Sequence, residues 1–355
     1  MRYLPFVLSV LAFPAVADVQ LTNLADSVRG KEYRFPVFSG APHVENINIY
    51  LQDKYLRHFP GNYQTSPFEK IMPSDEQAAD TTALDYSVEY LTPSVLSLRI
   101  NTTYSGAWSV DSKTYEQFDL TSGQPIIITD MFTPEGFKKL RDETIKDRLQ
   151  QASKASANIE AVVDNAYIAD EYRPRVLMMF KEQYEGCQKE IPTTFSADQT
   201  LRFYGDGIEV PMGRCTRGEI GEIDPVKLIS THFSLKKIAP WLNAYGQCLL
   251  VNKSQKCERA SDTLQVGVYH GRIGEKLITM VIGDNDYVRM ASGSGKEVME
   301  TEFYFQKPTD ENPKAIFKGI MNPAQFDLTY ANGSFKGIYH MKDNEQDSLP
   351  IVVNK

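Results

Sequence analysis

The sequence is poor in the residues on which most hydrolytic enzymes depend. Its five histidines are scattered along 355 residues, and it has neither an H-E-x-x-H metal motif nor a G-x-S-x-G nucleophile motif. Isolated histidines are more typical of ordinary surface or half-buried positions than of catalysts. We therefore expect a protein that is not an enzyme, with no catalytic residue, no cofactor and no metal site. The histidines are His43, His58, His232, His270 and His340.

Two short motifs look chemical but have simpler explanations. Ser292–Lys296 reads S-G-S-G-K, yet Met290 stands where a phosphate-binding loop needs its first glycine, so a hairpin tip is the better interpretation. The carboxylates Glu219, Glu222 and Asp224 could in principle perform acid–base chemistry. Their setting, G-E-I-G-E-I-D, is more typical of a solvated loop.

Basic residues are outnumbered, with 38 Lys and Arg against 46 Asp and Glu. Nucleic-acid binding depends on clustered cations that neutralise phosphates, so this balance argues against a nucleic-acid partner. A net negative charge favours encounter with a basic partner, although it also serves simply to keep an exported protein in solution. The length of the chain predicts two or three domains.

Long hydrophobic runs are absent beyond the N-terminus. No later segment approaches the roughly 18 consecutive apolar residues of a membrane-spanning helix, so we expect no membrane span. The first residues have the pattern of a secretory leader: basic Arg2, the apolar stretch Leu4–Phe13 and the small-residue site Ala15–Ala17. We expect a signal peptide over residues 1–17, cleaved after Ala17, and a periplasmic mature chain. No cysteine follows the cleavage site, which argues against a lipid anchor.

Cysteine is scarce, and all four residues lie in the second half of the chain: Cys187, Cys215, Cys248 and Cys257. An even number in an exported chain predicts two disulfides, for which three pairings exist. We favour Cys187–Cys215 and Cys248–Cys257, because the second pair would close a short loop with turn residues at Asn252–Ser254. A metal site is the rival explanation, but neither pair has C-x-x-C spacing and no histidine lies near them in sequence.

The first part of the mature chain predicts an antiparallel sheet with one packed helix. The strand expected over residues 32–42 contains Pro36, which is typical of a sheet edge. Apolar residues then recur at helical spacing from Val44 to Tyr55. Residues 84–90 and 95–104 alternate between polar and apolar side chains, as antiparallel strands do.

The middle of the chain predicts helices and a hairpin. Thr133 and Pro134 are the residue types expected at a helix N-cap and at the first helical position. Residues 151–195 favour helix, whereas Leu201–Val210 contains the Gly-Asp-Gly turn of a hairpin. Ile238–Leu242 is typical of a short closing helix.

Short strands and turns dominate the last third of the chain. Six strand patterns predict an all-β meander or a small barrel, at residues 263–269, 276–282, 298–306, 315–320, 325–330 and 334–341. The expected fold class is therefore α+β, an antiparallel sheet with packed helices followed by an all-β meander or small barrel domain. The expected domains are the signal peptide (1–17), an α+β binding domain (18–243), a disulfide-closed linker (244–262) and an all-β domain (263–355).

Four groups of segments carry a resemblance to a known family. They are Tyr33–Gly40 with Ile47 and Asn48, Phe118–Gln124 with Ile128–Phe132, Phe203–Ile208, and Ile238–Leu242. Together they make residues 32–242 similar to the extracytoplasmic module of the RsiV-like family, a family that includes lysozyme-binding anti-sigma sensors. The same module precedes the catalytic domain of PdaC-type peptidoglycan deacetylases. Where that family often has a G-G-A-H type loop, this chain reads Y-S-G-A-W without the histidine. Residues 264–341 look similar to small β-meander domains of envelope proteins.

The resemblance implies a recognition module, since one branch of the family binds lysozyme as a signal of attack on the cell wall. This chain has neither the membrane span of such a sensor nor a deacetylase domain. The leading hypothesis is therefore a periplasmic protein that neutralises a basic peptidoglycan-cleaving enzyme, as a lysozyme inhibitor or as an immunity protein against a rival's toxin. The expected partner-binding residues are Tyr104, Ser105, Gly106, Ala107 and Trp108. The alternative is a module that binds cell-wall glycan through some of its 19 tyrosines and inhibits nothing.

Overall fold

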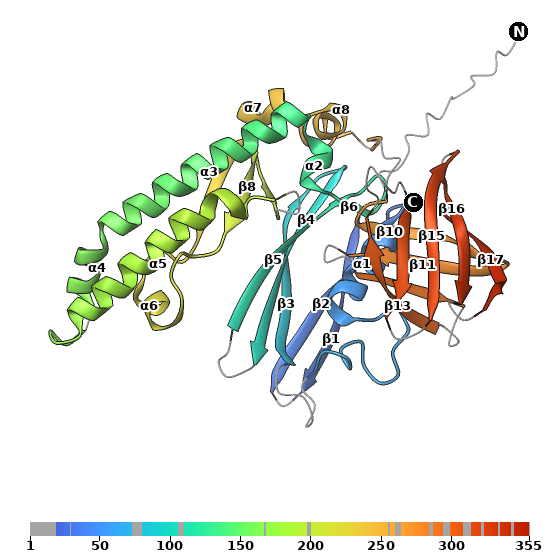
Figure 1. The fold of residues 1–355 in the computed structure, drawn as a ribbon, viewed down its shortest axis with the longest axis horizontal. Helices are drawn as coiled ribbons and strands as arrows, with labels where there is room; N and C mark the ends of the chain where they lie inside the picture. The colour runs from blue at the N-terminus through green and yellow to red at the C-terminus, as the bar shows by residue number, and fades with distance from the viewer. Residues whose placement is uncertain are drawn as a thin grey trace, which may run out of the picture.

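The computed structural model of the chain has three parts: an N-terminal sheet with one helix, a helical arm and a C-terminal barrel (Figure 1). No helix among the described residues is long and apolar enough to cross a membrane. The structure describes residues 19–28, 30–72, 80–105, 110–166, 168–196, 200–254, 256–259, 264–283, 287–293, 299–307, 314–320, 323–332, 334–341 and 344–354. The expected signal peptide, residues 1–17, lies outside this range.

The N-terminal sheet has six strands that follow one another in space as they do in sequence. They are β1 (Gln20–Val28), β2 (Lys31–Ser39), β3 (Asp80–Leu91), β4 (Val95–Ser105), β5 (Val110–Asp119) and β6 (Gln124–Pro125). Neighbours are antiparallel except β2 and β3, which run parallel and pair only at Tyr33 and Leu84. The expectation that the strand with Pro36 lies at the sheet edge was wrong, because β1 pairs with it from outside. On the side towards β3, β2 makes almost no strand-to-strand hydrogen bonds, so Pro36, which has no backbone N–H to donate, is tolerated there.

Helix α1 (Val44–Leu56) supplies the core of this part. The helix lies between the sheet and the barrel, and Ile47, Leu51 and Leu56 on it are fully buried. Each such side chain stabilises the fold by about 1.5–3 kcal/mol through removal of apolar surface from water. One face of β4 packs against the helix, as the alternation in the sequence predicted; its fully buried residues are Leu96, Leu98 and Ile100.

The helical arm is inserted between β6 and the barrel. Its elements are α2 (Ile128–Met131), α3 (Pro134–Ala157), α4 (Ile159–Asn165), α5 (Arg173–Thr194), β7 (Arg202–Tyr204), β8 (Gly207–Met212), α6 (Gly218–Ile223), β9 (Ile229–Ser234) and α7 (Leu235–Ile238). α3 and α5 lie side by side over the small sheet β7-β8-β9 (Figure 1). The predicted N-cap is confirmed, since the Thr133 hydroxyl accepts a hydrogen bond of 3.0 Å from the Gly136 N–H. The predicted hairpin is β7–β8, and a 3₁₀ turn over Ala239–Trp241 continues the short closing helix.

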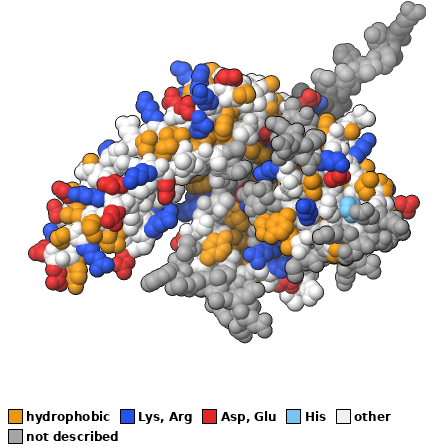
Figure 2. Space-filling view, in the orientation of Figure 1, with side chains coloured by type: hydrophobic (Ala, Val, Ile, Leu, Met, Phe, Trp, Pro, Cys, Tyr) orange, Lys and Arg blue, Asp and Glu red, His pale blue; other side chains and the backbone are white. Residues whose placement is uncertain are grey.

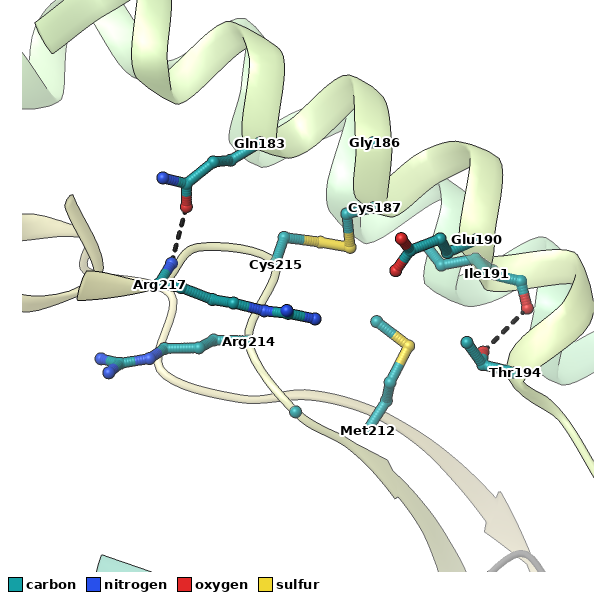
Figure 3. Close-up of a pocket in the computed structure, with 11 residues that line it drawn as sticks. Gln183, Gly186, Cys187, Glu190, Ile191, Thr194, Met212, Arg214, Cys215 and Arg217 are labelled. Atoms are coloured by element: carbon teal, nitrogen blue, oxygen red, sulfur yellow. Dashed lines mark hydrogen bonds between the residues drawn. A yellow bond between two sulfur atoms is a disulfide. The ribbon is translucent and has the colours of Figure 1, made fainter. Parts of the chain in front are cut away.

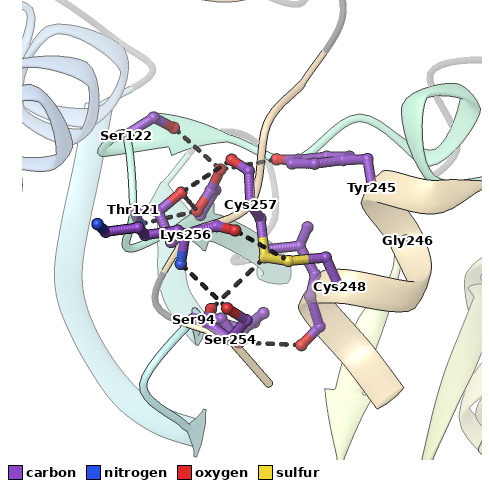
Figure 4. Close-up of a disulfide and its surroundings, with 12 residues drawn as sticks. Ser94, Thr121, Ser122, Tyr245, Gly246, Cys248, Ser254, Lys256 and Cys257 are labelled. Carbon is purple, nitrogen blue, oxygen red and sulfur yellow. Dashed lines mark hydrogen bonds between the residues drawn. A yellow bond between two sulfur atoms is a disulfide. The ribbon is translucent and has the colours of Figure 1, made fainter. Parts of the chain in front are cut away.

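The segment expected as a linker, residues 244–262, packs into the core of the arm. It contains α8 (Ala244–Gly246) and a π-helical turn over Gln247–Asn252. The Cys248–Cys257 disulfide closes it, and the buried Tyr245 hydroxyl donates a 2.9 Å hydrogen bond to Asp119 at the end of β5 (Figure 4). This bond fastens the segment to the N-terminal sheet.

Both disulfides join the cysteines that we favoured from the sequence. Cys187 on α5 is bonded to Cys215 after β8, and no free cysteine is found among the described residues. The first bond fixes the helix to the small sheet of the arm. Two disulfides are consistent with an exported protein.

The C-terminal part is a closed barrel of eight antiparallel strands, in which β17 pairs back with β10. The strands are β10 (Gly267–Ile273), β11 (Lys276–Ile282), β12 (Tyr287–Ser292), β13 (Met299–Gln306), β14 (Ala315–Gly319), β15 (Ala324–Ala331), β16 (Ser334–Met341) and β17 (Asn344–Asn354). The sequence patterns missed β12 and β17. In β12, Arg289 interrupts the apolar residues, which a barrel tolerates because alternate residues of a strand lie on its outer surface, where Arg289 meets Asp53 of α1.

The barrel is docked firmly onto the N-terminal part. The Gln124 side chain makes two hydrogen bonds of 2.8 Å with the backbone of Val268, one to its N–H and one to its carbonyl oxygen. Glu300 accepts hydrogen bonds from Asn62 at 2.6 Å and from Lys70 at 2.8 Å. Barrel residues also enter the core around α1; they are Val268, Val281 and Ala291. The two parts therefore share a hydrophobic core and a set of buried polar contacts.

Candidate binding surfaces

The residues expected to bind a partner lie at the tip of the β4–β5 hairpin. Tyr104 pairs with Val110 at the last described position of the hairpin, and its side chain is 45% exposed. Ser105 ends β4, whereas Gly106, Ala107 and Trp108 lie outside the described residues. The tip is at the free end of the sheet, away from α2 and α8 (Figure 1). An aromatic side chain is thus presented to solvent at this end of the sheet, where β3 still pairs with β4.

A network of charges joins the open face of the sheet to the arm. Arg202 on β7 contacts Glu89 at 2.6 Å and Glu209 at 2.9 Å, and Arg99 approaches Glu89 at 3.4 Å. The Arg202 guanidinium also lies 5.6 Å from the centre of the Tyr115 ring. Burial acts to raise the pKa of Glu89, but hydrogen bonds and the nearby arginines lower it overall. These ion pairs hold the arm in place relative to the sheet.

A first cleft, of about 500 Å³, lies in the arm between α5 and the loop after β8. The Cys187–Cys215 disulfide lines it together with Glu190 and Arg217, both exposed (Figure 3). The Arg217 N–H donates a 2.6 Å hydrogen bond to the Gln183 side chain, which holds the loop against the helix. The helix and the loop that form this cleft are therefore held together, but its charged side chains, Glu190 and Arg217, lie at the exposed rim.

A second cleft, of about 430 Å³, lies where α1 meets the outer surface of the barrel. Its centre is Arg289 on β12, which contacts Asp53 on α1 at 3.0 Å and Glu302 on β13 at 2.8 Å. We call this the junction cleft. Tyr287 on β12 lines it as well, and Tyr304 lies next to Tyr287 with ring centres 5.3 Å apart. Figure 2 shows hydrophobic and basic side chains together in the middle of this face, between the sheet and the barrel.

Asp53 has an unusual protonation equilibrium. Burial raises the pKa of this carboxyl to about 6, helped by the negative charges of Glu300 and Glu302, while Arg289 acts in the opposite direction. A raised pKa means that the folded chain binds the proton more tightly than the unfolded chain does. Ionised Asp53 therefore lowers the stability above pH 6 by about 3 kcal/mol, and this cost is removed as the pH falls towards 4.

We expect the pH profile of stability to change when Asp53 is replaced. If the free energy of unfolding is measured from pH 4 to pH 8, the wild type should gain up to about 3 kcal/mol relative to Asp53→Asn on going from neutral to acid pH, because asparagine does not titrate. Parallel profiles for the two proteins would contradict the assignment.

The other candidate groups are structural. The described residues contain no group of three His, Cys, Asp or Glu side chains placed to hold a metal. Of the carboxylates considered for acid–base chemistry, Glu219 and Glu222 are exposed on α6. The idea of a solvated loop was wrong for Asp224, which is buried because it accepts hydrogen bonds from Tyr184 at 2.8 Å and Thr216 at 2.7 Å.

Sequence reasoning missed the junction cleft entirely. Asp53 and Arg289 are 236 positions apart, and neither belongs to a motif. Tyr287 was missed as well, since β12 was not recognised as a strand, and its pairing with Tyr304 on the predicted strand β13 therefore went unseen. A feature of the sequence that could have indicated this cleft was Arg289, since an arginine among apolar residues is typical of a side chain that faces a partner or solvent.

The fold defines a disulfide-bonded α+β protein with a C-terminal β-barrel, and the clefts described above lie on its arm and at the junction of α1 with the barrel. No family model and no curated protein matches the sequence. Among solved structures, the chain is similar to a member of the DUF3298 family from Bacteroides fragilis, with 12% identity and a TM-score of 0.38. The match covers 67% of this chain and 97% of that one. A likeness at this level carries no argument about function.

Proposed function

We propose that this chain is a periplasmic binding protein that neutralises a peptidoglycan-cleaving enzyme. The target is a lysozyme-like enzyme or a toxin delivered by a rival bacterium, in which case the chain is an immunity protein. The observation that carries the proposal is Tyr104, which is 45% exposed at the last described pair of the β4–β5 hairpin. The two disulfides fit an extracytoplasmic site of action.

The hairpin is suited to enter a substrate cleft. β4 and β5 pair without a register shift from Val95–Asp119 to Tyr104–Val110, ten positions in all, a length of about 30 Å. β3 pairs with the other side of β4 as far as Ser105, so this end of the hairpin is held rigidly within the sheet. A rigid surface loses little conformational entropy on binding, which favours tight complexes.

Charge complementarity supports a basic target. The chain has an excess of eight acidic residues, and cell-wall hydrolases that act on an anionic polymer benefit from positive charge. Electrostatic attraction would raise the association rate, while the aromatic tip would supply the affinity. A stable complex buries roughly 1,200–2,000 Å² in total, so the tip must be joined by neighbouring surface of the sheet and arm.

Removal of both aromatic side chains at the tip tests this proposal. Central aromatic residues of an interface contribute about 2 kcal/mol or more, so Tyr104→Ala combined with Trp108→Ala should weaken inhibition at least about 30-fold. The measurement is titration of residues 18–355 into lysozyme and candidate wall hydrolases while the lysis of cell-wall suspensions is followed.

A matched control is Tyr172→Ala, an exposed tyrosine at the far end of the arm. This variant should inhibit as the wild type does. Failure of the wild type to inhibit any of these enzymes, or equal inhibition by the tip variant, would remove the basis of the proposal.

A further inference from the structure

A pair of half-exposed aromatic rings lies at the junction cleft. Tyr287 and Tyr304 are opposite each other on β12 and β13, and they are 45% and 52% exposed. Their neighbours Val288 and Phe303 point into the barrel and are buried, so the tyrosines belong to its outer surface. Large aromatic side chains that remain half exposed and side by side are typical of recognition surfaces.

A polar row lies beside the tyrosines. Two positions further along the same strands, Arg289 is opposite Glu302 and pairs with it, and Arg289 also pairs with Asp53 on α1. This spacing places the polar row about 6–7 Å from the aromatic row. Aromatic faces and bidentate charged groups are therefore within reach of one small molecule.

The charges of the cleft balance. Of the three basic residues that line it, Lys54 is already paired at 2.8 Å with Glu116, which lies outside the cleft. Arg57 and Arg289 then stand against the two lining carboxylates, Asp53 and Glu302. A balanced set has no surplus charge with which to capture a strong anion or cation. Such a set of charges is complementary to the hydroxyl groups of an uncharged ligand, because each hydroxyl can donate a hydrogen bond to a carboxylate and accept one from an arginine.

We infer that the junction cleft is a binding site for an uncharged oligosaccharide of pyranose rings. The C–H faces of a pyranose stack on aromatic rings, and the 5.3 Å between the tyrosine centres is on the scale of one sugar ring. Hydroxyl groups of the same sugar then meet Arg289, Glu302 and Asp53. The volume of about 430 Å³ is within the usual range of small-molecule sites.

This site is independent of the hairpin tip. Tyr104 is on the sheet at its free end, whereas the junction cleft is formed by α1 and the barrel. The chain would thus hold a glycan with one surface and an enzyme that acts on glycan with another. Loss of one activity leaves the other measurable.

The test uses the full mature chain and two probes. An N-acetylglucosamine tetrasaccharide is titrated by calorimetry, and purified peptidoglycan sacculi are used for co-sedimentation. We expect Tyr287→Ala combined with Tyr304→Ala to lower affinity at least about tenfold, because both stacking contacts are lost. Glu302→Gln should weaken binding by a smaller factor, since it removes an acceptor charge and keeps the shape.

The control is Tyr330→Ala, which removes a tyrosine of similar exposure, 44%, from another strand of the same barrel. It should bind as the wild type does, and thermal melts confirm that each variant is folded. Tyrosine-dependent binding to the tetrasaccharide supports the inference, whereas tyrosine-dependent binding to sacculi alone contradicts it, because the ligand would then be the anionic polymer and not an uncharged glycan. Absence of wild-type binding to both probes at millimolar sugar, or binding that the double variant retains, overturns the inference.

Discussion

Phe317→Ala should destabilise the barrel by about 3–5 kcal/mol, the largest effect that we expect from a single substitution. The Phe317 side chain is fully buried and lies between two other rings, with centres 4.9 Å from Phe305 and 4.4 Å from Phe326. Both pairs are stacked with the rings nearly parallel. Truncation would leave a cavity that neighbouring strands cannot close, because each of them is fixed by ladders on both sides.

The measurement is hydrogen exchange of the barrel amides together with a denaturant unfolding curve. Met299→Ala, which truncates a side chain that is 59% exposed at the start of β13, is the matched control and should change stability by less than about 0.5 kcal/mol. If Phe317→Ala lowered the free energy of unfolding as little as this control does, the three rings could not form the centre of the barrel core.

Loss of the Cys187–Cys215 disulfide should have the next largest effect. The two cysteines are 28 positions apart, and the chain-entropy relation gives a stabilisation of about 3.6 kcal/mol for a loop of that length. The bond also lies beside buried residues of the arm, including Ile191 and Ile220, so its removal loosens their packing. Thermal unfolding of a variant with both cysteines changed to serine, compared with the oxidised wild type, measures the loss.

The second disulfide supplies the comparison. Cys248 and Cys257 are only 9 positions apart, for which the same relation gives about 2.7 kcal/mol. The serine variant of this pair should therefore melt at a higher temperature than the variant of the first pair. The reverse order would show that packing around Cys248–Cys257, rather than loop closure, decides the stabilities.

Local rules predicted the elements that depend on nearby residues. The helix after Thr133 begins where the N-cap pattern placed it, because the hydroxyl needs only a neighbouring N–H. The face of β4 with Leu98 was equally readable, since alternation shows directly which side chains are buried. The favoured pairing of the cysteines, one of three that the sequence left open, is confirmed.

Other elements could not be predicted from nearby residues alone. The position of Pro36 in the sheet depends on β1 pairing from outside, and nothing near the proline signals that partner. Strand β12 carries Arg289, whose partner Asp53 lies on α1, so its apolar pattern is weak. The hydrogen bond that satisfies the buried carboxylate of Asp224 comes from a tyrosine 40 positions away.

By itself, the sequence determined the fold class, the disulfide framework and the main run of strands and helices, because propensity, alternation and capping act over a few residues. Only the tertiary structure decided that the barrel shares a core with α1 and that Asp53, Arg289 and the two tyrosines form one cleft. These groups meet through contacts between residues more than 200 positions apart, and no local preference encodes such contacts. The surfaces on which the proposals rest are therefore products of the packing between the parts of the chain.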